Sequence, residues 1–147
     1  MILEVILIGG LVGFSLCAGA MQKPNDVEVV AAVLIAEAGG EAVAGMEAVM
    51  EVIQNRCRVH GCVSLAQVCL KPGAFSCLIG TTPEKLIRRA KKHRKWRLAV
   101  GMAKMGVITK LAKGANHYHE ASLDPKPAWA DPAKITARIG NHIFYKL

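Results

Sequence analysis

The feature that most constrains the fold is an uninterrupted apolar run, residues 29–36, which leads into a single carboxylate and then into Gly39 and Gly40. Asn25, followed three residues later by Glu28, forms a capping box, which predicts that a helix begins here. A helix that is apolar around its whole circumference must be buried. The sequence therefore predicts a central helix that ends at the edge of the core, with one of the glycines as a left-handed cap.

The carboxylate at the end of this run is Glu37. Burial disfavours a charged carboxylate, and the negative end of the helix dipole disfavours it further, so both effects favour the protonated form. A carboxylic acid that keeps its proton near neutral pH can act as a general acid. Glu37 is therefore the first catalytic candidate, and the alternative is an ordinary side chain that extends from the helix end into water.

The first 22 residues differ in composition from the rest of the chain. Residues 5–21 contain no charged side chain and close with the small residues Ala18-Gly19-Ala20, as a secretory signal does. The segment before this run contains Glu4 instead of Lys or Arg, and the run is nearly long enough to span a bilayer. We therefore expect residues 1–22 to be a signal peptide or a membrane anchor, and residues 23–147 to be one catalytic domain.

Cysteine spacing is the next indication of an exported protein. After Cys17 in the leader, four cysteines follow in the domain with the spacing C-x4-C-x6-C-x7-C. This pattern lacks the C-x2-C pairs that zinc sites prefer, so we favour disulfides over a zinc site. We predict the local pairs Cys57–Cys62 and Cys69–Cys77, and other pairings of the four remain open at this point.

The chain is strongly basic, with a formal net charge of +8 that removal of Glu4 with the leader would raise to +9. Seven of the ten residues 88–97 are Lys or Arg. Such a charge implies an anionic partner: nucleic acid, acidic lipid or the acidic polymers of a bacterial wall. The leader and the disulfides argue against nucleic acid. For residues 88–97 themselves we favour a solvated helix face, with wall binding as a by-product.

Capping residues and apolar spacing predict the other helices. The first is a helix over residues 41–55, with Gly45 as a close-packing point against the preceding helix. The second is a short helical turn after Ser64, within a cross-linked loop that exposes Phe75. The third is a helix that begins at Thr82-Pro83 and breaks near His93.

The last third of the chain predicts extended structure. In an extended segment His117 and His119 point to one face and Tyr118 to the other. The chain then predicts a hairpin with a type II′ turn, made of residues 134–139, the turn Gly140-Asn141, and residues 142–145. The expected fold class is α+β: a small, mostly helical domain with a C-terminal β-hairpin.

Six short segments resemble, in the same order, the cell wall hydrolase family that includes the spore cortex-lytic enzymes. They are LIAEAGGE (34–41), GMEAVMEVIQNR (45–56), WRLAVGMA (96–103), GANHYH (114–119), PAWA (127–130) and IGNHIFY (139–145). Each segment is short, but together they cover almost the whole chain after the leader.

The resemblance implies a small lysozyme-like fold that cleaves the glycan strands of peptidoglycan, with Glu37 as the catalytic acid. It also implies the lytic transglycosylase route at N-acetylmuramic acid, which leaves an anhydro end. The family usually has Gln where this chain has Ala74, so one polar contact to substrate is expected to be missing. We expect an exported monomer that needs no cofactor and no metal.

Several further side chains are candidates for substrate binding. Glu41 is either a second carboxylate for the chemistry or a cap for the second helix. Tyr118 and His119 could donate hydrogen bonds to sugar N-acetyl and hydroxyl groups. Aromatic side chains could stack on sugar rings. The full set of substrate-binding candidates is Glu41, Phe75, Ser76, His117, Tyr118, His119 and Trp129, with Tyr145 as a further stacking candidate.

Two other classes of protein fit parts of the sequence. A zinc hydrolase would use His117, His119 and His142 as ligands and Glu37 as base. A basic exported protein that binds walls or other polyanions without catalysis would rest on residues 88–97 alone. We rank the enzyme first, the binding protein second and the metalloenzyme third.

Overall fold

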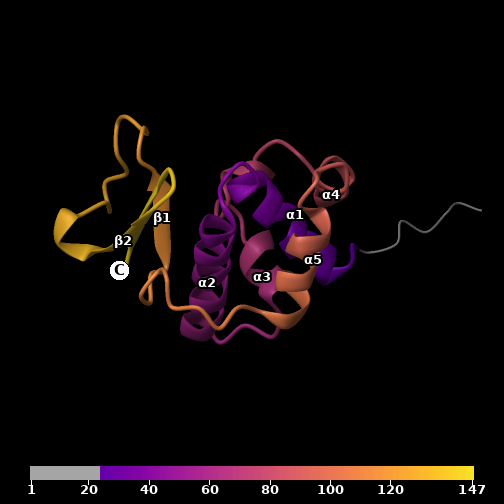
Figure 1. Ribbon diagram of the computed structural model, residues 1–147, viewed down its shortest axis with the longest axis horizontal. Coiled ribbons are helices and arrows are strands. Elements are labelled where there is room, and N and C mark those ends of the chain that lie inside the picture. Colours follow the sequence, from indigo (N-terminus) through magenta and orange to yellow (C-terminus); the bar gives the residue numbers. More distant parts are fainter. Residues whose placement is uncertain (1–23) are drawn as a thin grey trace, which may run out of the picture.

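A computed structural model describes residues 24–147, so the predicted leader, including Cys17, lies outside the described residues. The elements are α1 (Asp26–Ala38), α2 (Val43–His60), α3 (Leu65–Leu70), η1 (Ser76–Leu78), α4 (Pro83–Ala90), α5 (Trp96–Met105), β1 (His117–Glu120), η2 (Pro132–Lys134), β2 (Ile135–Ile139) and β3 (His142–Tyr145). The predicted α+β class, mostly helical with a C-terminal hairpin, is confirmed (Figure 1). Within residues 24–147, none of the helices combines the length and the hydrophobicity of a membrane span.

Helix α1 is the centre of the helical part, as its apolar run predicts. It packs against α2, α3, α4 and α5, and the side chains from Val29 to Leu34 are buried. The Asn25 side chain accepts a hydrogen bond from the Val27 amide (2.9 Å), which confirms the predicted start. The predicted left-handed cap is wrong: Gly39 is right-handed (φ −62°), and Gly40 does not have a positive φ either. The backbone of Gly39 lies against the His93 ring, which leaves little room for a side chain.

Helix α2 is longer than predicted and ends five residues later. Its last residue is His60, because Gly61 adopts the left-handed conformation (φ 61°) that ends a helix. The predicted packing point Gly45 is close-packed, but its neighbour is the Glu41 side chain and not α1. A Cβ atom at Gly45 would lie 2.7 Å from the Glu41 Cβ atom.

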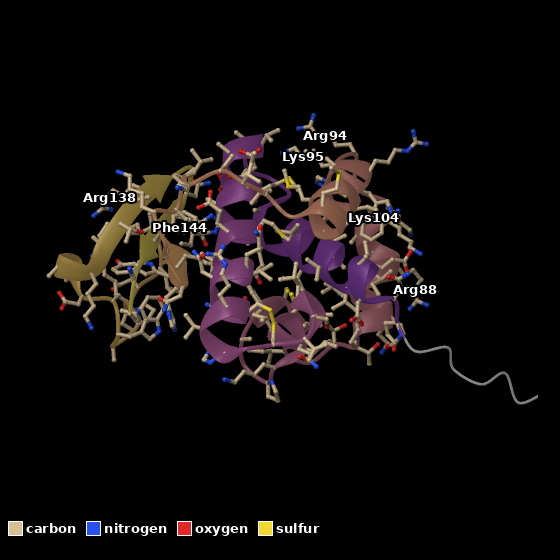
Figure 2. All side chains as sticks on the ribbon, turned by 90° about the horizontal axis from the view of Figure 1, so that it is seen from below. Arg88, Arg94, Lys95, Lys104, Arg138 and Phe144 are labelled. Atoms are coloured by element: carbon tan, nitrogen blue, oxygen red, sulfur yellow. A yellow bond between two sulfur atoms is a disulfide. The ribbon has the colours of Figure 1, made fainter. Side chains whose placement is uncertain are left out.

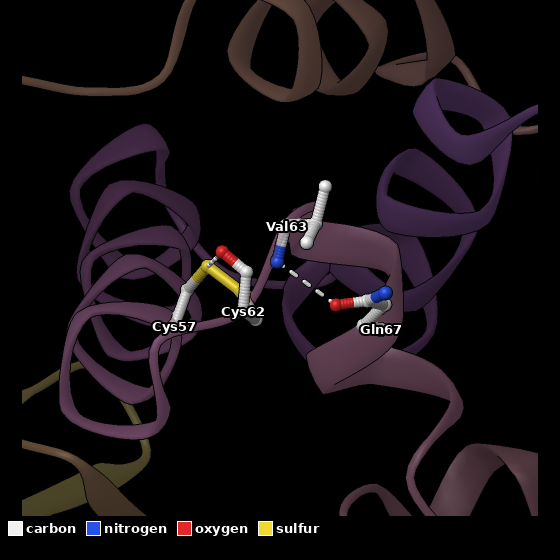
Figure 3. Close-up of a disulfide and its surroundings, with 4 residues drawn as sticks. All are labelled: Cys57, Cys62, Val63 and Gln67. Carbon is white, nitrogen blue, oxygen red and sulfur yellow. Dashed lines mark hydrogen bonds between the residues drawn. A yellow bond between two sulfur atoms is a disulfide. The ribbon is translucent and has the colours of Figure 1, made fainter.

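One of the two predicted disulfides is present. Cys57 on the last turn of α2 is bonded to Cys62 just beyond it, and Figure 3 shows this bridge beside the hydrogen bond from the Val63 amide to the Gln67 side chain (2.9 Å). The predicted Cys69–Cys77 bridge is wrong, and both residues are free thiols. Burial raises the pKa of Cys69 to about 12, so the thiolate needed for disulfide exchange is disfavoured there.

Replacing both Cys57 and Cys62 by Ala should lower the free energy of unfolding by about 2 kcal/mol, because the bridge closes only a short loop in the unfolded chain. Urea denaturation of the oxidised protein and of the double variant measures this difference. Alkylation of the unfolded wild type without reductant should label Cys69 and Cys77 but neither bridged residue. An unchanged midpoint would contradict a stabilising Cys57–Cys62 bridge. Protection of all four cysteines from alkylation would contradict the free thiols of Cys69 and Cys77.

The predicted helix from Thr82-Pro83 and the break near His93 are both confirmed. The Thr82 hydroxyl accepts from the Lys85 amide (3.4 Å), α4 ends at Ala90, and α5 begins at Trp96. Most basic side chains of residues 88–97 are exposed on these two helices and the turn between them. Figure 2 shows Arg88, Arg94 and Lys95 on the helical side of the molecule, away from Arg138 and Phe144 on the sheet.

The sheet has three antiparallel strands in the order β1-β3-β2 and lies beside α2 (Figure 1). The predicted hairpin joins β2 to β3, and Gly140 has φ 56° at the first central position of its turn, as a type II′ turn requires. Strand β1 pairs with β3 so that Tyr118 lies opposite Phe144 and His119 opposite Ile143. The predicted alternation of His117, Tyr118 and His119 is therefore confirmed.

Four polar side chains of α2 attach the segment that leads from α5 into β1. Glu51 is buried and accepts hydrogen bonds from the Thr109 hydroxyl (2.8 Å) and from two backbone amides, those of Leu111 (2.8 Å) and Ala112 (2.9 Å). The other three side chains also reach backbone groups: Gln54 bonds the amide and carbonyl of Val107, Asn55 the carbonyl of Ala115, and Arg56 the carbonyl of Asn116. These contacts fix where β1 begins relative to the helices.

Candidate active site

The candidate site forms where the end of α1 meets β1. The Tyr118 hydroxyl donates a hydrogen bond to the Glu37 Oε2 atom (2.8 Å), which brings together two residues that the sequence analysis selected independently. Burial raises the pKa of Tyr118 well above its usual value, and the charge of Glu37 raises it further. Tyr118 is therefore a neutral hydrogen-bond donor throughout the physiological pH range.

The second carboxylate oxygen of Glu37 differs from the first in having no partner. Glu37 Oε1 is buried and has no hydrogen-bond partner in the described part of the chain. It belongs to a side chain that lines a cavity of about 190 Å³, formed by Ala36, Glu37, Gly39, Gly40, Glu41, Glu120, Asn141 and His142. Buried polar atoms in folded proteins nearly always have partners, so an unpaired carboxylate oxygen in a side chain that lines a cavity makes Glu37 a candidate for contact with a ligand.

Glu41 crosses from the α1–α2 connection to the turn of the hairpin. Both of its carboxylate oxygens lie 3.4 Å from the Asn141 amide nitrogen, and Oε1 lies 4.0 Å from His142 Nδ1. A side chain at Gly140 would overlap the Glu41 carboxylate, so glycine is required there for packing as well as for φ. Glu41 makes no capping hydrogen bond to α2, because Ala42 is the N-cap and the helix has no side-chain cap, although the Glu41 side chain lies against the first turn at Gly45.

His142 is a site residue that sequence reasoning assigned only to a zinc site. Its side chain is 8% exposed, its ring edge packs against the Tyr118 ring (centroids 5.1 Å apart, 87° between planes), and Phe144 lies on the same ring (5.6 Å). His142 Nδ1 is buried without a hydrogen-bond partner among the described residues. The signal in the sequence was its position directly after the hairpin turn, opposite the extended Tyr118 strand.

The strand register does not fit the zinc alternative. His117 and His119 point to one face of the sheet, whereas His142 shares the opposite face with Tyr118. His119 is buried with both ring nitrogens occupied, Nδ1 at the Glu120 carbonyl (2.7 Å) and Nε2 at the Tyr145 hydroxyl (2.9 Å). The three histidines therefore cannot surround one ion.

A larger cleft of about 750 Å³ lies on the other side of Tyr118. It is lined by the end of α2, by α3 and the loop after it, by β1 and by Trp129. His117 and Trp129 both line it and lie against each other (ring centroids 5.1 Å apart). Of the predicted substrate-binding residues, His117, Tyr118 and Trp129 line this cleft and Glu41 lines the smaller cavity, whereas Phe75, Ser76 and His119 line neither.

Phe75 was predicted to be exposed, and this is wrong. Its ring is 4% exposed and packs under the Arg56 guanidinium (5.0 Å from the ring centroid). The apolar ring and the cation cover each other, so Phe75 packs beneath Arg56, which lines the cleft, and does not face solvent. Ser76, directly after it, is exposed at the start of η1.

Arg56 is a residue of the candidate site that sequence reasoning did not single out. It donates hydrogen bonds to the Asn116 carbonyl (2.6 Å) and the Ala74 carbonyl (3.1 Å) and lines the larger cleft. Burial lowers the pKa of Arg56, while its neighbours Tyr118, Cys69 and Glu37 act in the opposite direction. An arginine remains cationic in proteins, so the Glu37–Tyr118 pair has a fixed positive charge nearby.

Comparison with known proteins identifies a family. The model of the cell wall hydrolase family matches residues 40–145, a range that begins three residues after Glu37. The catalytic domain of the germination-specific lytic transglycosylase SleB from Bacillus anthracis is similar in structure (TM-score 0.63, 27% identity, covering 88% of this chain and 98% of that one). The catalytic domain of the Bacillus cereus SleB protein is also similar (TM-score 0.54, 25% identity, covering 88% and 99%).

A comparison with curated protein sequences gives no match. The family model nevertheless covers well over half of the chain, and it includes the strand with Tyr118 and the hairpin with His142. Both structural similarities extend over nearly all of the described residues. This chain is a member of the cell wall hydrolase family.

Proposed function

We propose that this enzyme cleaves the glycan backbone of peptidoglycan at N-acetylmuramic acid, as a lytic transglycosylase with Glu37 as general acid and then general base. Membership of the cell wall hydrolase family supports a wall-degrading enzyme, and the similar Bacillus anthracis domain is described as a lytic transglycosylase. The observation that carries the assignment of Glu37 is its geometry: one oxygen is held by Tyr118, and the other is buried and unpaired beside a cavity.

The proposed chemistry needs only one carboxylate. Protonated Glu37 gives its proton to the oxygen of the scissile glycosidic bond as the C1–O bond breaks and positive charge develops at C1. The carboxylate then removes the proton from the sugar's own C6 hydroxyl, whose oxygen bonds to C1 and closes the anhydro ring. Glu37 ends the cycle protonated, as it began, and no water is consumed.

Other residues would then position the reacting groups. The Tyr118 hydrogen bond at Oε2 fixes the orientation of the Glu37 carboxyl group, and His142 and Phe144 pack against the edge and the face of the Tyr118 ring. The Glu41 carboxylate faces the hairpin turn, which supports a positioning role and not that of a second nucleophile. His117 and Trp129 in the larger cleft are the proposed sugar contacts.

Mass spectrometry of the products from purified peptidoglycan tests this function. A lytic transglycosylase releases fragments that end in anhydro-N-acetylmuramic acid, each lighter by one water than the product of hydrolysis. We expect anhydro ends. Reducing N-acetylmuramic acid ends would show a true hydrolase instead, and reducing N-acetylglucosamine ends would show that the bond is the wrong one.

We propose that the enzyme acts after export, as a monomer and without a cofactor, and that its basic surface helps it to adsorb to walls. The charged side chains of residues 88–97 line neither the cavity nor the cleft at Glu37. Replacing Arg88, Arg89, Lys91 and Lys92 with Gln should therefore weaken adsorption to whole walls severalfold, as high salt should. Cleavage of short soluble glycan fragments should not change.

A sedimentation assay with intact walls measures adsorption, and product release from soluble fragments measures turnover. The wild type at high salt serves as the matched comparison. If a folded quadruple variant lost the cleavage of soluble fragments, the basic surface would belong to the active site. If neither property changed, residues 88–97 would be a solvated face without a targeting role.

A further inference from the structure

The two spaces that flank the Glu37–Tyr118 pair carry opposite charges. The smaller one is lined by three carboxylates: Glu37, Glu41 and Glu120. The larger one is lined by basic side chains: Arg56, His60 and Lys71. No Asp or Glu is among the described residues that line this larger cleft. Because Glu37 lines one space, Tyr118 lines the other, and the two side chains are hydrogen-bonded, the change of charge falls at the reacting centre.

We propose that the larger cleft binds the anionic peptide stem of peptidoglycan and that Lys71 and His60 recognise its carboxylates. This inference rests on the proposed function, because it takes peptidoglycan as the substrate. The sugars of the backbone carry hydroxyl and N-acetyl groups, and the stem on the lactyl group of N-acetylmuramic acid carries the carboxylates. The stem is therefore the part of this polymer that a basic cleft can distinguish.

The basic residues of the cleft divide into a floor and a rim. Arg56 lies at the floor, where its guanidinium donates hydrogen bonds to the Asn116 and Ala74 carbonyls. These bonds hold its positive charge in a fixed position. Lys71 and His60 are exposed, and within residues 24–147 their side chains make no hydrogen bond and no ion pair. They are free to contact a charged group that enters the cleft.

The state of His117 is consistent with a positive potential in this cleft. Its pKa is lowered, first by burial and then by the electrostatic effect of the nearby Arg56 and His60. Neutral His117 bonds to Asn116 through Nδ1 (3.0 Å) and packs against Trp129, which leaves an aromatic wall beside the basic rim. A sugar ring can rest on Trp129 while its lactyl peptide extends toward Lys71.

The acidic cavity makes the opposite orientation unfavourable. A stem directed into it would place its carboxylates beside those of Glu41 and Glu120, where like charges repel. Neutral hydroxyl and amide groups carry no such cost. The charge difference therefore orients the glycan strand across the site.

The test compares two soluble glycan oligomers of equal length, one with peptide stems and one from which an amidase has removed them. The affinity of each oligomer is measured with the Glu37→Gln protein, which should bind without cleaving. The KM for each oligomer is measured with the wild-type enzyme, and the two values are compared. We expect the oligomer with stems to bind about threefold to tenfold more tightly at low salt, since each exposed charge pair contributes roughly a twofold to fivefold effect. The preference should shrink as salt screens the charges.

Variants locate the preference in the cleft. The double substitution Lys71→Gln/His60→Gln should remove most of it and leave the affinity for the stripped oligomer unchanged. Lys104→Gln on α5 removes a charge of the same kind from the helical side of the molecule and should retain the preference (Figure 2). Equal affinity for both oligomers, or an equal loss of preference in Lys104→Gln, would overturn the proposal.

This result is separable from the proposed function. Cleavage of either oligomer by the wild type tests the backbone reaction, and its absence would overturn that reaction. The stem preference is read from binding to the Glu37→Gln protein and does not depend on turnover. An enzyme that cleaves both oligomers with the same KM and binds them equally would retain its function and exclude the stem site.

Discussion

Replacing Glu37 with Gln should leave the protein folded and reduce wall cleavage by roughly 10²–10⁴-fold, the usual contribution of a general acid–base group. The amide has almost the same size as the carboxyl group, and its carbonyl oxygen can still accept the hydrogen bond from Tyr118. It cannot give a proton to the leaving oxygen or take one from the C6 hydroxyl. The measurement is the initial rate at which anhydro ends appear from purified peptidoglycan.

A matched control shows that the loss belongs to this carboxylate. Glu84→Gln makes the same chemical change in the first turn of α4, outside both spaces at the site, and should retain wild-type activity. Thermal denaturation and circular dichroism establish that both variants are folded. Wild-type activity in a folded Glu37→Gln protein would remove Glu37 from the mechanism, even though the family assignment would remain.

Replacing Glu51 with Ala should lower the free energy of unfolding by about 3–5 kcal/mol, because it removes the acceptor of three hydrogen bonds and leaves the buried Ala112 amide and the partly buried Leu111 amide unpaired. Such a loss is a large fraction of the stability of a small domain. The segment that Glu51 holds leads directly into β1, so Tyr118 should also be less firmly placed. Urea denaturation measures the stability, and the rate of wall cleavage well below the transition measures the placement.

Two controls separate the hydrogen bonds from the rest of the helix. Glu51→Gln keeps one side-chain oxygen as an acceptor and should lose less stability than Glu51→Ala. Glu47→Ala, one turn earlier on α2, removes a carboxylate that makes no hydrogen bond or ion pair in the described residues, so it should change the stability by about 0.5 kcal/mol or less. Equal midpoints for Glu51→Ala and Glu47→Ala would show that the segment is held by other contacts.

Tyr118 depends on this attachment because β1 has few other contacts with the helices. The side chains of α2 from Gln54 to Arg56 bond the backbone between Val107 and Asn116, and the next residues along the chain begin the strand. Figure 1 shows α2 between the other helices and the sheet. Helix α2 therefore helps to hold the strand with Tyr118 in a position from which Tyr118 reaches Glu37 on α1.

Local features of the chain were determined by the sequence alone. The apolar run in α1, the Thr82-Pro83 start, the break at His93, the alternation around Tyr118 and the hairpin at Gly140-Asn141 all depend on neighbours within one or two turns. Such features follow from backbone geometry and local capping, which adjacent residues decide. Glu37 was also found in this way, as the carboxylate that directly follows the apolar run of α1.

Contacts between residues far apart in the chain were decided only by the tertiary structure. Glu41 reaches Asn141, one hundred residues away, and Glu51 reaches a segment about sixty residues away, although both carboxylates look alike in the sequence. The packing of Gly39 against His93 at the end of α1, the burial of Phe75 and the free thiols of Cys69 and Cys77 have the same origin. Each depends on which surface packs against it, and packing partners are not encoded in local spacing. The sequence therefore pointed to the proposed catalytic carboxylate, while the fold decided which residues surround it.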